Sequence, residues 1–112
     1  MVYIDRVEYT FRHVRDTLIG ASSELPFSEL YLFGSAARGE FKLGSDLDFL
    51  LVVDDPAVRK RVSVGVEFLD VRSDTGPVPV DVIVRTKDYI ENSKDIFTCE
   101  VRRDRKLLWK RG

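Results

Sequence analysis

Two aspartates spaced by one residue, Asp46 and Asp48, begin a long apolar segment and have the spacing needed for metal chemistry. Side chains at positions i and i+2 of a strand lie on the same face, about 6.6 Å apart at roughly 3.3 Å per residue. Two carboxylates this close repel each other unless a proton or a cation lies between them. Because Mg²⁺ prefers oxygen ligands of this kind, the pair predicts a magnesium site.

A glycine-serine pair, Gly34 and Ser35, precedes the aspartates. Gly34 allows the backbone to turn sharply and to approach a ligand closely. A helix beginning at about Ser35 would direct its free N–H groups and positive dipole end at the turn, which suits a phosphate. Carboxylates beside a phosphate seat predict Mg-dependent phosphoryl or nucleotidyl transfer. The alternative is an ordinary strand-to-helix turn with Ser35 as its N-cap.

A third carboxylate, Asp81, lies within the apolar run 78–84. A charge buried in such a strand is costly unless it is paired or bound to a metal. Either an arginine pairs with Asp81, or Asp81 completes the metal site of Asp46 and Asp48. The presence of those two aspartates favours the metal site.

The segments GSAARG at 34–39 and GSDLD at 44–48 together resemble the signature of the DNA polymerase β-like nucleotidyltransferase superfamily. The chain is most similar to the minimal nucleotidyltransferases (MNT domains, MntA-like), whose pattern adds one more carboxylate on a later strand. Asp81 occupies that place. The motif is not a Walker A loop, because no Gly-Lys-Ser/Thr follows, and it is not a GxGxxG fingerprint.

The resemblance implies an enzyme that uses ATP and two Mg²⁺ ions, roughly 3.5–4 Å apart in two-metal sites. The implied catalytic and metal-binding residues are Asp46, Asp48 and Asp81. The implied nucleotide-binding residues are Gly34, Ser35, Arg38 and Ser45. Asp81 is also a candidate to accept the proton of the acceptor hydroxyl. Arg38 has two alternatives, to hold the loop or to be an ordinary surface arginine.

Apolar periodicity predicts the elements that lead into this motif. Side chains at three- and four-residue steps form one stripe, which predicts a helix over residues 3–20. The stripe contains Ile4, Val7, Phe11, Val14 and Leu18. Gly20 is the expected C-terminal stop of this helix, and the apolar run 30–33 is the expected first strand.

The second strand, residues 46–53, is apolar on both faces beyond its first residues, which predicts a central strand. Residues 57–71 fit a helix by one spacing of valines and a strand by another. We expect a helix, because a crossover is needed to bring the next strand, 78–84, in beside the second, and the resemblance also implies it. Asp55 is the expected N-cap and Pro56 the first helical residue.

The last third of the chain predicts two short helices and an edge strand. Thr86 is expected to cap the first helix, and Ser93 the second, which reaches about Arg102. The side chains expected to face inward are Ile90, Phe97 and Val101. Residues 106–110 predict an edge strand protected by charge. The expected fold is α/β (α+β), a mixed sheet of about four strands with helices packed on it, as in the palm domain of the resembled superfamily.

Composition places the chain among ordinary globular proteins, with 112 residues, 44% hydrophobic and 33% charged, and a net charge of −1. We expect one domain over residues 1–112. The charge gives no strong signal for nucleic acid or a membrane surface. The single cysteine, Cys99, excludes an intramolecular disulfide, and the sequence has neither a membrane-length apolar run nor a signal-peptide pattern. A cytoplasmic protein is expected.

The acceptor is where alternatives stay open. The chain ends soon after the expected palm, which suggests that a partner, or an oligomer, supplies the rest. Stand-alone relatives of the resembled family pair with a HEPN-domain toxin ribonuclease and transfer AMP from ATP to a tyrosine of that partner, so the resemblance implies an antitoxin. The other hypotheses are an antitoxin that neutralises its partner by contact alone, and a nucleotidyltransferase acting on a small molecule.

Overall fold

The computed structural model describes residues 3–40, 46–71 and 78–112, of which Tyr3 and Ile4 are described by their backbone alone. Along the chain, the elements are α1 (Tyr3–Ala21), β1 (Glu29–Phe33), α2 (Gly34–Ala37), β2 (Leu47–Val53), the 3₁₀ turn η1 (Pro56–Val58), α3 (Arg59–Phe68), β3 (Val80–Thr86), α4 (Lys87–Asn92), α5 (Ile96–Asp104) and β4 (Lys106–Lys110).

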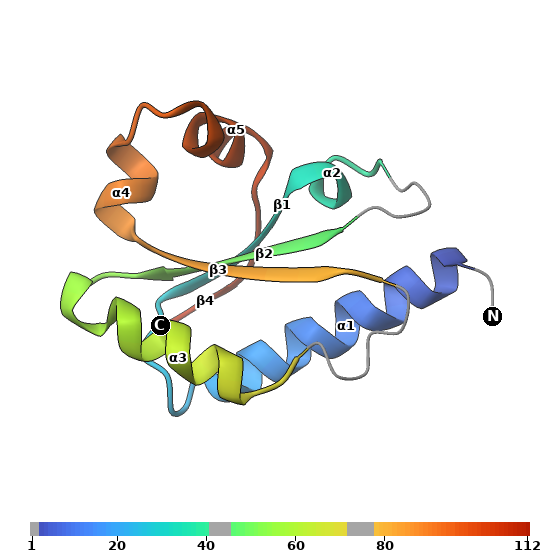
Figure 1. Cartoon of the computed structure of the whole chain (residues 1–112), viewed down its shortest axis with the longest axis horizontal. Helices are drawn as coiled ribbons and strands as arrows, with labels where there is room; N and C mark the ends of the chain where they lie inside the picture. The colour runs from blue at the N-terminus through green and yellow to red at the C-terminus, as the bar shows by residue number, and fades with distance from the viewer. Residues whose placement is uncertain (1–2, 41–45, 72–77) are drawn as a thin grey trace.

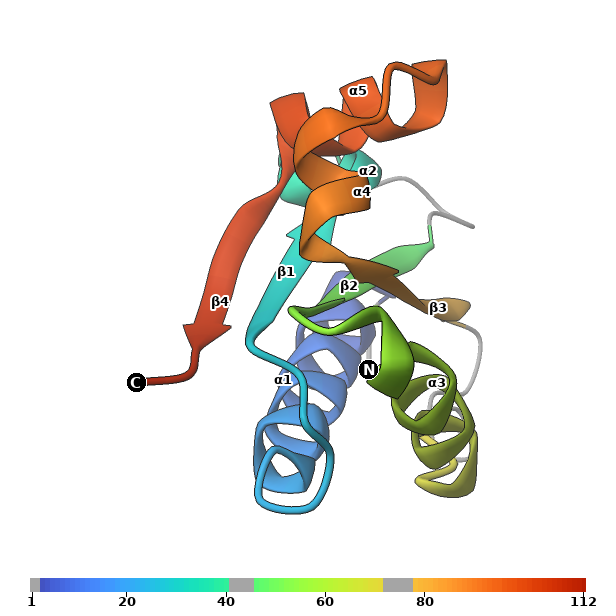
Figure 2. The ribbon, with the colours of Figure 1, turned by 90° about the vertical axis from the view of Figure 1, so that its left-hand side faces the viewer.

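The strands within these ranges form one four-stranded sheet in the order β3-β2-β1-β4. β2 and β3 are parallel, whereas β1 is antiparallel to both β2 and β4. Figure 2 shows this order, with β4 and β3 at the two edges. The expected mixed α/β fold is therefore confirmed, and the strand expected over 106–110 has those bounds and that edge position.

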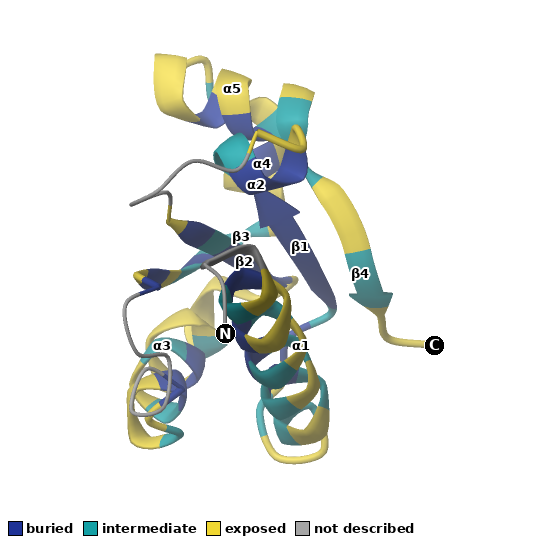
Figure 3. Cartoon of the chain, turned by 90° about the vertical axis from the view of Figure 1, so that its right-hand side faces the viewer, coloured by how far each residue is buried: buried dark blue, intermediate teal, exposed yellow. Residues whose placement is uncertain are grey.

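Helices cover both faces of the sheet, with α1 and α3 on one face and α4 and α5 on the other (Figure 1). The larger apolar core lies under α1 and α3, and the smaller one under α4 and α5. Both central strands are almost fully buried, as Figure 3 shows for β1. Two-sided burial explains why β2 is apolar on both faces.

Helix α1 forms as its apolar stripe predicts. Val7, Val14 and Leu18 are buried against the sheet, and Phe11 is partly buried beside Phe49. The helix extends to Ala21, one residue beyond the expected stop. The side chain of Ile4, which the stripe includes, lies outside the described residues. None of the helices in the described ranges is long and apolar enough to cross a membrane.

The crossover between β2 and β3 is helical, so the choice of helix for residues 57–71 is confirmed. The carboxylate of Asp55 accepts the N–H of Ala57, and Pro56 begins the 3₁₀ turn. Helix α3 then buries Val62 and Val66 and ends at Phe68. Strand β3 occupies 80–86 instead of 78–84, because Pro79 has no N–H to donate to the ladder and contributes only its carbonyl, which accepts the N–H of Leu47.

The last two helices differ from expectation at one cap and one side chain. Thr86 caps α4 as expected, accepting the N–H of Tyr89. The N-cap of α5 is Asp95 and not Ser93, because the Asp95 carboxylate accepts the N–H of Thr98 and Ser93 lies two residues too early. Phe97 is 47% exposed, so its expected inward position is wrong, although its ring still contacts Phe33.

Candidate active site

Asp48 and Asp81 lie side by side where the parallel strands β2 and β3 begin. They are register partners across the strand pair. Side chains alternate along β2, so Asp48 shares a face with Leu50, which packs under α4 and α5. Those helices cover the later residues of both strands and leave the strand beginnings less covered, since Asp48 is half-buried and Asp81 is exposed. The site therefore opens at one end of the helix-covered face.

The burial expected for Asp81 is wrong, because its place near the start of β3 lies before the helices that cover this face. Because Asp81 is exposed, its charge does not carry the cost of burial in an apolar strand. Asp81 is a candidate site residue because it lies directly opposite Asp48 in the register of β2 and β3.

Three carboxylates act on one another electrostatically at this end of the sheet. Burial, and then the charges of Asp46 and Asp81, raise the pKa of Asp48 from 3.8 to about 6. Asp46 is exposed and immediately precedes β2. The structure thus gathers the three carboxylates that the sequence singles out, and it makes Asp48 the one whose charge is least favourable without a counterion.

The backbone of Gly34 closes directly over the Asp48 carboxylate. Gly34 has a φ of +76°, and a Cβ placed on it would lie 2.5 Å from Oδ2 of Asp48. Phe33, the residue before it, is the register partner of Asp48 across β1 and β2. Glycine is needed here for two reasons: the backbone is left-handed, and a Cβ would collide with the Asp48 carboxylate. The close contact of Gly34 in the structure is with Asp48, and its approach to a bound ligand stays a prediction.

Helix α2 is a single turn that starts at Gly34, one residue earlier than expected. Its N-cap is Phe33, with no side-chain cap, so the interpretation of Ser35 as an N-cap is wrong. The carbonyl oxygen of Ser35 accepts the N–H groups of Arg38 at 3.1 Å and Glu40 at 2.9 Å. These bonds fix the main chain at the Gly-Ser turn.

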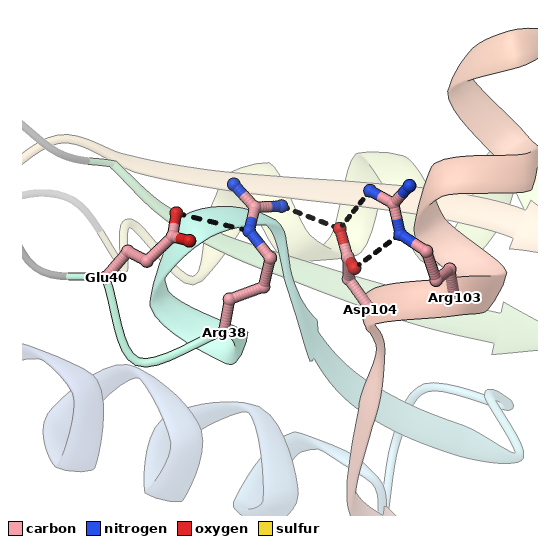
Figure 4. A network of polar contacts seen from close by, with 4 residues as sticks. All are labelled: Arg38, Glu40, Arg103 and Asp104. Atoms are coloured by element: carbon pink, nitrogen blue, oxygen red, sulfur yellow. Dashed lines mark hydrogen bonds and ion pairs between the residues drawn. The ribbon is translucent and has the colours of Figure 1, made fainter.

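Arg38 is exposed and contacts two carboxylates, which Figure 4 shows. Its Nη1 donates to Asp104 Oδ2 at 2.6 Å, and its Nε donates to Glu40 Oε2 at 3.3 Å. These hydrogen bonds raise the pKa of Arg38, with the Asp104 bond the larger cause. Asp104 also accepts two bonds from Arg103, which together with Arg38 hold its pKa below the ordinary value.

Asp104 belongs to no motif that sequence reasoning singled out. A signal was present, because Asp104 is the one acid within the basic run 102–106, where an ion pair is expected. Ser45, expected to support the nucleotide, lies outside the described residues.

The chemistry of the carboxylates fits Mg²⁺. Within the described ranges, no three Asp, Glu, His or Cys side chains form a ready-made metal cage. Mg²⁺ is usually bound by one or two carboxylates together with substrate phosphates, so such a cage is not required. Asp46 and Asp48 offer oxygen donors of the right type, and a cation there would favour the ionised form of Asp48, whose pKa is raised first by burial and then by the charges of Asp46 and Asp81.

A mixed sheet that presents clustered aspartates beside a Gly-Ser turn defines a class of enzymes that transfer nucleotidyl groups. The model of the nucleotidyltransferase domain family matches residues 17–105, which include all the candidate residues. The chain therefore belongs to the nucleotidyltransferase domain family.

Two solved structures share this fold. A Sulfolobus solfataricus protein classed as a nucleotidyltransferase is 25% identical, covering 95% of this chain and 87% of its own, with a TM-score of 0.55. A toxin–antitoxin determined with AMP-PNP is 19% identical over 87% of this chain and 73% of its own, with a TM-score of 0.50. A variant of the toxin–antitoxin MntA–HpeT is 19% identical over 99% and 75%, with a TM-score of 0.41. None of the curated proteins searched matches the chain significantly.

Proposed function

We propose that this nucleotidyltransferase transfers AMP from ATP to a tyrosine hydroxyl of a HEPN-domain toxin and so acts as its antitoxin. The observation that carries the proposal is the contact of Gly34 with Asp48, inside a cluster completed by Asp46 and Asp81. The likeness to a toxin–antitoxin determined with AMP-PNP, an ATP analogue, supports the nucleotide and the kind of partner.

In this proposal Asp46 and Asp48 would hold Mg²⁺, and Asp81 would help to hold a second ion. When bound, the metal neutralises the triphosphate and lowers the pKa of the acceptor hydroxyl. The main-chain N–H groups of the Gly34–Ser35 turn and the Ser35 hydroxyl bind triphosphate oxygens. Close packing of Gly34 on Asp48 sets the position of those groups relative to the carboxylates, which limits the freedom of the bound nucleotide.

The proposed reaction is an in-line displacement at the α-phosphorus of ATP. The acceptor oxygen attacks the α-phosphorus in line, the bond from that phosphorus to the bridging oxygen breaks, and pyrophosphate leaves. Asp81 is exposed beside Asp48, so its carboxylate is accessible to take the acceptor proton.

Transfer of label from ATP labelled at the α-phosphate tests this function. The chain is incubated with Mg²⁺ and the candidate HEPN protein, beside matched Asp46→Asn and Asp48→Asn variants whose folding is checked by circular dichroism. We expect label on the HEPN protein with the wild-type chain and a loss of at least about a hundredfold in either variant.

Binding of the HEPN protein without labelling would replace transfer by neutralisation through contact. Label on a tyrosine-free HEPN variant, in which each tyrosine is replaced by phenylalanine, would exclude a tyrosine acceptor. Undiminished labelling by Asp46→Asn or Asp48→Asn would contradict the assigned metal site.

A further inference from the structure

We propose that Asp104 is a positioning residue, which fixes the Gly34–Ser35 turn by holding Arg38, and that Arg38 clamps α2 instead of binding the triphosphate. The consequence for transfer rests on the proposed function. The structural part of the proposal stands on contacts between α2 and α5, two elements far apart in the sequence (Figure 4).

Helix α2 is too short to fix its own position. It has four residues, and isolated helical turns are unstable because a costly nucleus is offset by very few bonds. Its buried side chains are only the methyl groups of Ala36 and Ala37. Arg38 follows α2 directly, and its N–H donates to the carbonyls of Gly34 and Ser35. Holding Arg38 in place therefore holds the Gly34–Ser35 turn.

Asp104 has the properties of a fixed anchor. Its side chain is only 8% exposed, and it ends helix α5, which is held in the core by Thr98 and Val101. Both carboxylate oxygens accept hydrogen bonds, Oδ2 from Arg38 at 2.6 Å and from Arg103 at 3.2 Å, and Oδ1 from Arg103 at 2.9 Å. Loss of Arg38 would remove the shortest of these bonds from a carboxylate that is largely shielded from water.

The position of Arg38 also argues against a role as a triphosphate ligand. Its guanidinium already contacts Asp104 and Glu40, one through Nη1 and the other through Nε. Binding a triphosphate through Nη1 would require the 2.6 Å bond to break and would leave the buried Asp104 with Arg103 alone. The pair instead links α5 through α2 to the Gly34 backbone that packs on Asp48.

A double-mutant cycle separates the two roles. The clamp predicts that Arg38→Gln and Asp104→Asn each lower kcat/KM for label transfer by about ten- to a hundredfold, the range typical of residues that orient a site from behind. The kcat/KM of the double variant should then be no lower than that of the less active single variant, since both changes break the same Arg38–Asp104 contact. We also expect Asp104→Glu to recover part of the lost kcat.

If Arg38 instead bound the triphosphate, Asp104→Asn would free it and leave the nucleotide KM unchanged or lower. Arg38→Gln would then raise the KM, and the double variant would keep the raised KM of Arg38→Gln, because Asp104→Asn acts only through Arg38. That pattern, or wild-type kcat in Asp104→Asn, overturns the proposal.

Two controls make the test specific. Arg105→Gln, at the C-cap of α5, breaks the 3.0 Å ion pair with Glu91 of α4 and the contact of Arg105 with the Tyr31 ring, and leaves the Arg38–Asp104 pair in place. Arg103→Gln removes the second partner of Asp104 and keeps Arg38 in place. Both variants should keep kcat/KM within about twofold of the wild-type value. A loss equal to that of Asp104→Asn would show that the Asp104→Asn loss comes from lower overall stability and not from the clamp.

Amide hydrogen exchange tests the clamp without any activity. The N–H groups of Arg38, Gly39 and Glu40 all donate to carbonyls within the turn. In Asp104→Asn they should exchange faster than in Arg105→Gln, and equal rates overturn the clamp. A wild-type chain that transfers no label in any assay contradicts the proposed function, and exchange then decides the proposal by itself.

Discussion

Gly34 and Gly39 have nearly the same left-handed backbone, with φ of +76° and +77°, but only Gly34 contacts the candidate site. Alanine at either position should lower the free energy of unfolding by about 1–2 kcal/mol, the cost of this backbone for a residue with a Cβ. At Gly34 the Cβ would also displace the Asp48 carboxylate, whereas at Gly39 it meets nothing within 4 Å.

We therefore expect Gly34→Ala to abolish label transfer and Gly39→Ala to retain it, at similar stability in urea denaturation. Gly39→Ala is a matched control because it reproduces the backbone strain without the contact. Equal loss of transfer in the two variants would show that strain in the turn, and not contact with Asp48, decides activity.

The raised pKa of Asp48 predicts a specific dependence of stability on pH. The unfolded chain releases this proton near the ordinary pKa of 3.8, whereas the folded chain holds it until about pH 6. Between these values the folded state binds more protons, so the Asp48 contribution to stability falls as pH rises and stays reduced above about 6.

Asp48→Asn removes this titration. In buffer with EDTA, its melting temperature minus that of the wild-type chain should increase between pH 4 and pH 7, in the window set by the two pKa values. Thermal unfolding at closely spaced pH values measures it. A difference that is constant across the window would mean that Asp48 does not titrate as its burial and neighbours indicate.

At the scale of elements, α3 shows how packing overrides weak helix propensity. Gly65 lowers the propensity of this helix, but a Cβ there would lie 2.5 Å from Cδ2 of Leu25, so the glycine makes room for that side chain. In a Leu25→Ala background, Gly65→Ala should raise the free energy of unfolding by about 1 kcal/mol, the intrinsic gain of alanine over glycine.

In the wild-type background the same substitution should gain less or be destabilising, because Leu25 must move. Urea denaturation of the four proteins gives the coupling directly. Equal effects of Gly65→Ala in both backgrounds would show that Leu25 adjusts without cost.

Elements with strong periodicity were predictable from sequence, whereas details set by distant contacts were not. The stripe of α1 and the two-sided apolar run of β2 led to correct elements because each pattern records the local surroundings. The cap of α5 was missed because Ser93 and Asp95 are both good caps, and Asp95 also accepts bonds from Tyr89 and Thr98.

The candidate site divides in the same way. The clustering of Asp48 with Asp46 followed from local spacing, and the third carboxylate followed from the family resemblance. The anchor of Arg38 at Asp104 lies 66 residues away, so it became visible only when α5 was placed beside α2.

Across the whole molecule, arginines hold both ends of β1, the strand that leads into the Gly-Ser turn. At its far end lies the Arg38–Asp104 pair. At its start, the guanidinium of Arg111 donates to the carbonyls of Phe27 at 3.0 Å, Ser22 at 2.8 Å and Leu25 at 3.2 Å. The C-terminal residues thereby tie edge strand β4 to the segment between α1 and β1.

Arg111→Gln should lower the free energy of unfolding by about 1–2 kcal/mol, since hydrogen bonds from a charged donor to carbonyls are lost. Label transfer per folded molecule should be unchanged, because the change affects the start of β1 and not Gly34. Lys110→Gln, at an exposed position of β4, is the matched control for loss of one positive charge. If Arg111→Gln is no less stable than Lys110→Gln, the contacts of Arg111 with the three carbonyls do not secure the start of β1. The pairing of β4 with β1 would then hold the start of β1 without them.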